Sequence, residues 1–357
     1  MLAFKYISFH YLKYFFIILT ALVIFMVGFD YMSSAEKLSH SANLTLIYLV
    51  YKTFFSIDMV LPLSLVFALI STKLFLIRSN ALVSLYSLGY SRVAILRPFI
   101  VVSTGIILIF IALHASSSFS RSQELAYNIR EHGQYLSPTR DLFFTYKKKY
   151  VYFSKMLPLQ KKAIGIRIFS LKDGFLKEVL VASSAVYRDD SWLINKADII
   201  IKPDKMDFES LGMRVTQAKD LKILEGFRPK MLDQVYEGKV NFTIKDAIDA
   251  LILLEGQNID TNGIRAALYK IFIYPFFVPF LVVILFFLVP ISVRFLNVSL
   301  FSFGATIAAL LIWGGLFMLN ELSNTKTISS EVGIILPVFV LFIFAFIQYK
   351  GYFHLHK

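Results

Sequence analysis

The chain has 357 residues, of which 57% are hydrophobic and only 17% are charged. A soluble protein of this length could not cover so much apolar surface with polar groups, so this composition excludes a soluble globular protein and indicates an integral membrane protein. The net charge of +13 is better explained by basic loops beside anionic membrane lipid than by nucleic acid, which we do not expect as a partner. Cysteine is absent, which excludes disulfides and thiolate metal sites, and we expect no cofactor or metal.

Six stretches are apolar over the roughly 17 to 25 residues that a helix needs to cross about 30 Å of hydrocarbon. The first also starts like a signal peptide, but Gly28 to Ser34 offers no clean cleavage site, so we expect it to remain as a transmembrane helix. The six expected spans centre on Phe15–Phe29, Ile57–Ile77, Val93–Leu113, Leu268–Val289, Leu300–Leu319 and Val332–Tyr349.

The hydrophobic density falls between the third and fourth spans, over residues 116–265. Residues 1–115 and 266–357 would then hold three spans each, on either side of an inserted domain. Within the insertion, short alternating segments such as Ile164, Ile166 and Ile168 predict a β-sandwich or jelly roll over about 137–226. A periodic apolar segment predicts a helical return to the membrane over about 241–265.

Basic residues gather in the short loops on one side of the predicted membrane, without any Asp or Glu among them. Because translocation of positive charge is disfavoured, that side should be the cytoplasm. Both termini are then expected in the cytoplasm and the inserted domain outside, and Lys73 and Arg97 are expected to extend to the cytoplasmic surface. The basic residues are Lys5, Lys13, Lys73, Arg78, Arg92, Arg97, Arg294, Lys350 and Lys357.

Residues 78–92, RSNALVSLYSLGYSR, predict a short amphipathic helix that ends at Gly89, a suitable C-cap. This segment resembles the cytoplasmic coupling helix of the LptF/LptG permeases of the lipopolysaccharide-export ABC transporter. Phe29-Asp30, at the end of the first span, resembles LptG more than LptF. Further matching positions occur in the same order along the chain: Pro62, Gly165 to Phe169 with the Asp173-Gly174 turn, Ala182 to Ala185, Trp192-Leu193, and Phe242 through Lys270 to Pro275.

The resemblance implies an inner-membrane permease subunit that extracts lipopolysaccharide and passes it through a periplasmic jelly roll to a bridge towards the outer membrane. It also implies an LptB ATPase dimer, a second permease subunit (LptF or LptG), LptC and LptA as partners. The chain has no Gly-x-x-x-x-Gly-Lys-Ser/Thr sequence, so ATP hydrolysis is expected in the separate LptB subunit and the permease itself is not expected to be an enzyme.

The family usually has a Glu near the start of the coupling helix, where this sequence has Asn80 and Ala81. Coupling to the ATPase would therefore depend on apolar side chains that fill a groove, with Arg78 and Arg92 at its rim. The coupling candidates are Arg78, Leu82, Leu85, Tyr86, Gly89, Tyr90, Ser91 and Arg92.

Asp30, Lys37 and Lys52 lie near the outer ends of the first two spans and are candidates for contact with lipid headgroups. The alternative is that they are ordinary interfacial or solvated residues. His114, at the outer end of the third span, is expected to be structural rather than a proton relay.

Two other functions stay open at this point. A membrane-bound enzyme that modifies lipid A would need a catalytic cluster, yet the inserted domain has one histidine, His132, and no Gly-x-Ser-x-Gly sequence. An ion-driven secondary lipid transporter would need charged groups in the middle of broken spans, and the spans offer few.

Overall fold

The structure is a computed structural model that describes residues 2–38, 41–130, 139–157, 161–172, 175–189, 191–203, 212–227, 243–254, 261–288, 297–325 and 327–354. The chain divides into two compact units. The first comprises Met1–His132, Val240–Leu251 and Asp260–Lys357, and the second comprises Gly133–Lys239 and Ile252–Ile259. Several residues named above lie outside the described ranges, namely His132, Asp173, Gly174, Phe242, Val289, Arg294 and Lys357.

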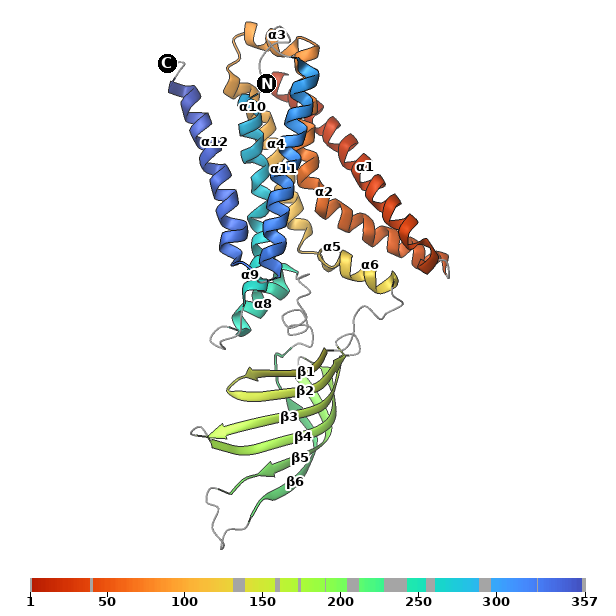
Figure 1. Cartoon of the computed structure of the whole chain (residues 1–357). Coiled ribbons are helices and arrows are strands. Elements are labelled where there is room, and N and C mark those ends of the chain that lie inside the picture. The colour runs from red at the N-terminus through yellow and green to blue at the C-terminus, as the bar shows by residue number, and fades with distance from the viewer. Residues whose placement is uncertain are drawn as a thin grey trace. The chain divides into compact units, whose positions relative to one another are not determined.

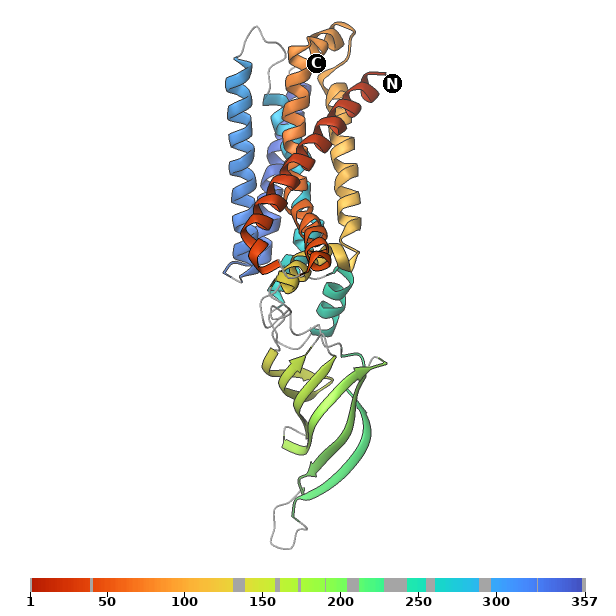
Figure 2. The same ribbon diagram turned by 90° about the vertical axis from the view of Figure 1, so that its right-hand side faces the viewer.

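The first unit is helical (Figures 1 and 2). Six helical segments in the described residues are long and apolar enough to cross a membrane, which confirms the six predicted spans. The fourth span combines α9, η1 and α10, because Pro275 interrupts the α-helix. The elements are α1 (Leu2–Leu38), α2 (Ala42–Arg78), α3 (Ala81–Ser87), α4 (Arg92–Leu113), α5 (Ser117–Ser120), α6 (Ser122–Arg130), α8 (Ile244–Leu254), α9 (Asn262–Phe272), η1 (Tyr274–Phe276), α10 (Phe277–Leu288), α11 (Val298–Asn324), the π-helical turn η3 (Glu331–Ile335) and α12 (Leu336–His354).

Helix α2 is the centre of the helical unit and packs against α1, α4, α10 and α11. Its middle section is almost continuously buried, and Leu65, Leu69 and Leu76 join the main apolar core. By contrast α1, α11 and α12 leave large apolar side chains exposed along their length, among them Phe25, Phe29, Leu311, Phe339 and Phe344. Such continuous apolar surface is suited to lipid or to another membrane protein, and not to water.

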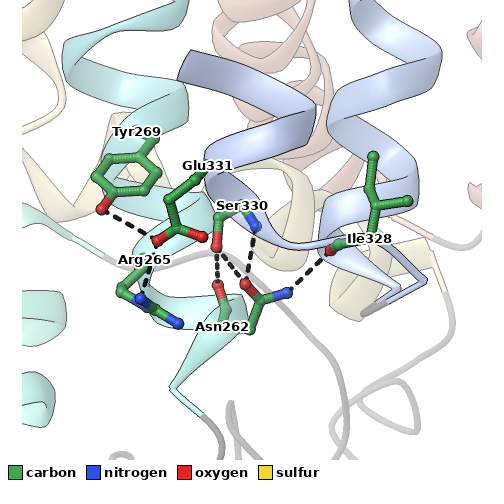
Figure 3. A network of polar contacts seen from close by, with 6 residues as sticks. All are labelled: Asn262, Arg265, Tyr269, Ile328, Ser330 and Glu331. Atoms are coloured by element: carbon green, nitrogen blue, oxygen red, sulfur yellow. Dashed lines mark hydrogen bonds and ion pairs between the residues drawn. The ribbon is translucent and has the colours of Figure 1, made fainter. Parts of the chain in front are cut away.

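A polar network joins the start of the fourth span to the connection between α11 and α12 (Figure 3). The Asn262 side chain donates to the Ile328 carbonyl (3.2 Å) and accepts from the Ser330 backbone N–H (2.9 Å). Arg265 forms an ion pair with Glu331 at 2.8 Å. The network fixes α9 against the last two spans through directional bonds as well as apolar packing.

Gly333 lies in η3 where the backbone passes close to α11. A Cβ at this position would lie 1.9 Å from Ser323 Oγ and 2.8 Å from the Leu319 carbonyl oxygen, so no larger residue fits without displacement. We therefore expect Gly333→Ala to destabilise the protein by about 1–3 kcal/mol, the usual cost of overpacking. Thermal unfolding in detergent measures this effect.

Gly315→Ala is the matched control, because a Cβ there has no heavy atom within 4 Å. Gly315 lies inside α11, where alanine is also the better helix former. Equal unfolding temperatures for the two variants would contradict the close approach at Gly333.

The second unit contains one antiparallel sheet in which each strand pairs with the next, in the order β1-β2-β3-β4-β5-β6. This confirms the predicted inserted β domain. The described strands form a single curved sheet (Figures 1 and 2), whereas a two-sheet sandwich would divide them between two layers. The strands are β1 (Thr139–Tyr146), β2 (Lys149–Leu157), β3 (Lys162–Lys172), β4 (Phe175–Arg188), β5 (Ser191–Ile201) and β6 (Arg214–Ile223).

The core of the β unit is aromatic. Trp192 is fully buried, and its indole Nε1–H donates to the Phe227 carbonyl at 2.9 Å. Phe144 stacks on Phe227 with ring centroids 4.6 Å apart, and Phe153 lies 5.4 Å from Trp192. Alternate residues of β1, β2 and β5 thus cover one apolar face of the sheet.

Candidate functional site

The segment between the second and third spans is shorter in its helical part than predicted. Its helix α3 covers only Ala81–Ser87, because α2 continues to Arg78 and a turn follows at Ser79 and Asn80. Asn80 has φ +57, a left-handed conformation that Asn tolerates better than most residues. Residues 78–92, predicted to form one short helix that ends at Gly89, therefore form the end of α2, a turn, the short helix α3 and a second turn before α4.

Gly89 ends α3 as predicted. Its φ is +85. The Gly89 N–H donates to the Tyr86 carbonyl at 3.0 Å, and the Tyr90 N–H donates to the Leu85 carbonyl at 3.1 Å. This bonding pattern is the Schellman motif, which satisfies the last carbonyls of a helix. Ser91 then caps α4, since its Oγ accepts from the Ala94 N–H at 3.2 Å. Both ends of the turn are thus held by hydrogen bonds.

The inner face of α3 is attached to the helical core. Leu82 is 0% exposed, and Leu85, Tyr86 and Tyr90 are partly buried against the same core. Leu82 anchors the segment to the chain itself, so its side chain is not available to a partner's groove as the sequence suggested.

The outer face presents residues that the sequence analysis did not select. Leu88 is 74% exposed and Val83 is 39% exposed, and the Arg78 side chain is also exposed. Leu82, Leu85 and Tyr86 recur at helical spacing and face the core, and Val83 lies to the side of that face, where it is exposed. Leu88 is exposed because the chain leaves the helix there. Helical spacing identifies Val83 as exposed only when the buried face of the segment is already known, and the sequence alone does not show that face.

Lys73 was predicted to extend to the cytoplasmic membrane surface, and this prediction is wrong. It is 3% exposed, lies between α2 and α10, and donates a hydrogen bond to the Phe286 carbonyl. Its Nζ also lies 4.0 Å from the centroid of the Phe286 ring. Arg97, for which the same prediction was made, is exposed.

Two of the three candidate lipid contacts bind each other. Lys52 Nζ lies 2.6 Å from Asp30 Oδ1, and the Tyr48 hydroxyl donates to the other carboxylate oxygen of Asp30. Lys52 is almost completely buried, with the rings of Phe55 and Tyr127 at 5.0 and 5.2 Å. Lys37 is exposed. A lipid anion would therefore have to compete with Asp30 for Lys52.

His114 is also paired within the chain. Its Nε2 lies 2.9 Å from Asp58 Oδ1, and its Nδ1 lies 3.0 Å from the Phe110 carbonyl oxygen. The contacts join α2 to the end of α4, which agrees with the structural role expected for this histidine.

Residues 5–350 match the family model described as Lipopolysaccharide export system permease LptF/LptG, and the match covers nearly the whole chain. None of the curated proteins matches the chain. The family match does not distinguish LptF from LptG. This chain, an inner-membrane protein with six membrane-spanning helices and an inserted β domain, therefore belongs to the LptF/LptG family of lipopolysaccharide export permeases.

Proposed function

We propose that the chain is a non-catalytic permease subunit that extracts lipopolysaccharide from the inner membrane and passes it to its periplasmic β domain. It would act with a second permease subunit, an LptB ATPase dimer, LptC and the LptA bridge. Family membership supports the transport system, and the six spans with an inserted β domain fit the permease role. The partners and the direction of transfer belong to the proposal.

The charge distribution supports a cytoplasmic location for α3. Helix α1 begins and α12 ends at the same end of the helical unit as α3 (Figure 1). That end carries Lys5, Arg78, Arg92, Arg97 and Lys350, as expected for the cytoplasmic side. Three spans separate that end from the inserted domain, so under this proposal the inserted domain lies in the periplasm.

The observation that carries the proposal is the construction of the segment over residues 78–92. It is fixed to the core by Leu82, closed by hydrogen bonds at Gly89 and Ser91, and it exposes Leu88 and Val83. We propose that LptB packs on this exposed apolar pair, with Arg78 at the edge of the contact. Closure of the ATPase dimer on nucleotide would then move α2 and α4 as attached levers.

The substrate has several acyl chains and anionic groups, which sets two chemical requirements. The exposed apolar faces of α1, α11 and α12 are suited to acyl chains and to the second permease. Lys37 and the Lys52–Asp30 pair are the candidates near the headgroups.

Purification from detergent tests the function directly. The chain is expected to co-purify with a cytoplasmic ATPase and a second permease, and the complex in proteoliposomes should release lipopolysaccharide only with hydrolysable ATP. Transport that needs a proton gradient and ignores ATP would favour the secondary transporter. Covalent change of the lipid by the purified chain would favour the enzyme.

A further inference from the structure

Lys73 is a buried lysine close to the end of α2 that leads to α3. It lies five residues before the end of α2, beside residues such as Leu76 and Ile77 that are themselves buried. An ammonium group in an apolar bundle costs free energy unless it has a partner, and such residues are usually kept for a function.

One partner lies in a different span. Lys73 donates a hydrogen bond to the Phe286 carbonyl, close to Leu288, the last described residue of α10. A backbone carbonyl is a strong hydrogen-bond acceptor, and it is suited to a lysine side chain, which only donates. The Phe286 ring, 4.0 Å from the Lys73 Nζ, adds a cation–π contact.

Phe286 also packs against an aromatic residue of α4. The Phe286 ring lies 5.9 Å from the Phe99 ring, and Phe99 lies 5.2 Å from Tyr11 of α1. Helices α2 and α4 are connected to α3 through the chain, whereas α10 is not. Apolar packing alone allows helices to slide, but a charged hydrogen bond to one carbonyl fixes a position along the helix axis.

We propose that Lys73 is a positioning residue that fixes α10 to α2, so that movement of the segment over residues 78–92 also moves the fourth span. This inference rests on the proposed function. It explains how movement caused by the ATPase would reach the fourth span, which is not next to α3 in the sequence. The same residue would otherwise only stabilise the fold.

The test uses the complete complex in proteoliposomes, with ATP hydrolysis and lipopolysaccharide release measured in the same sample. Lys73→Met removes the charge and keeps most of the side-chain volume. We expect assembly and ATP hydrolysis within about twofold of wild type, and at least about fivefold less lipopolysaccharide released per ATP, the lower range of measured coupling between sites. Lys73→Arg, which can still donate to the carbonyl and stack on Phe286, should restore most of this ratio.

Lys13→Met is the matched control, since Lys13 is an exposed lysine in α1, and its ratio should equal that of wild type. An unchanged ratio in Lys73→Met, or equal losses of hydrolysis and release together with a lower unfolding temperature, would overturn the positioning role. A wild-type complex that releases no lipid with ATP would instead contradict the proposed function, before any variant is compared.

Discussion

Leu88→Asp is expected to weaken binding of the LptB ATPase more than any other single substitution in the segment over residues 78–92. Leu88 is 74% exposed, so it costs little to replace in the permease alone. In the proposed complex the aspartate would be a charge buried in an apolar contact, which costs about 2 kcal/mol or more at a central interface position. That corresponds to roughly 30-fold weaker association. Co-purification at increasing salt and titration of LptB onto the permease in nanodiscs measure it.

Phe175→Asp is the matched control, because Phe175 is 76% exposed but lies in the β unit. It introduces the same charge at an equally exposed apolar position, and LptB binding should be unchanged. Leu85→Asp and Tyr86→Asp are poorer tests, because both side chains pack against the core and their replacement would also unfold the segment. If Leu88→Asp and Val83→Asp both bound LptB like wild type, the docking surface would lie elsewhere.

The spans were predictable because their signal is local. A membrane-crossing helix must satisfy its own backbone and present apolar side chains, so composition over some 20 residues is sufficient. The hairpins of the β domain were also visible in the sequence as alternating residues with turns between them. The Lys147-Lys148 turn, with φ of +46 and +62, is the mirror-image type that matches strand twist.

The direction in which each charged side chain points was not predictable. Lys73 and Arg97 stand near the same membrane surface, but only Lys73 faces another span, and its partner Phe286 is 213 residues away. The turn before α3 was missed for a different reason: Ser79 and Asn80 are not strong helix breakers, and only Gly89 marks an end of the helix. Sequence patterns locate the segment over residues 78–92, but neighbouring helices decide which of its faces is exposed.

The Asp30–Lys52 pair makes the second strong prediction, since its two members should respond differently. Asp30→Ala leaves the buried Lys52 ammonium and the Tyr48 hydroxyl without their acceptor, and removing one member of a buried pair costs about 3 kcal/mol. Lys52→Met should cost less, because the Asp30 side chain keeps 20% exposure and its bond from Tyr48. Thermal unfolding in detergent ranks the two.

The double variant separates a structural pair from a lipid site. Asp30→Ala with Lys52→Met removes both charges, so it should recover most of the stability lost in Asp30→Ala alone.

If the pair only joins α1 to α2, lipopolysaccharide crosslinking and release should recover together with stability. If Lys52 exchanges Asp30 for a lipid phosphate during extraction, release should remain low although the fold is restored. Recovery of stability without recovery of release is the result that we expect, because Lys52 lies near the outer end of its span, where anionic headgroups are found. Full recovery of both would remove Lys52 from the substrate path.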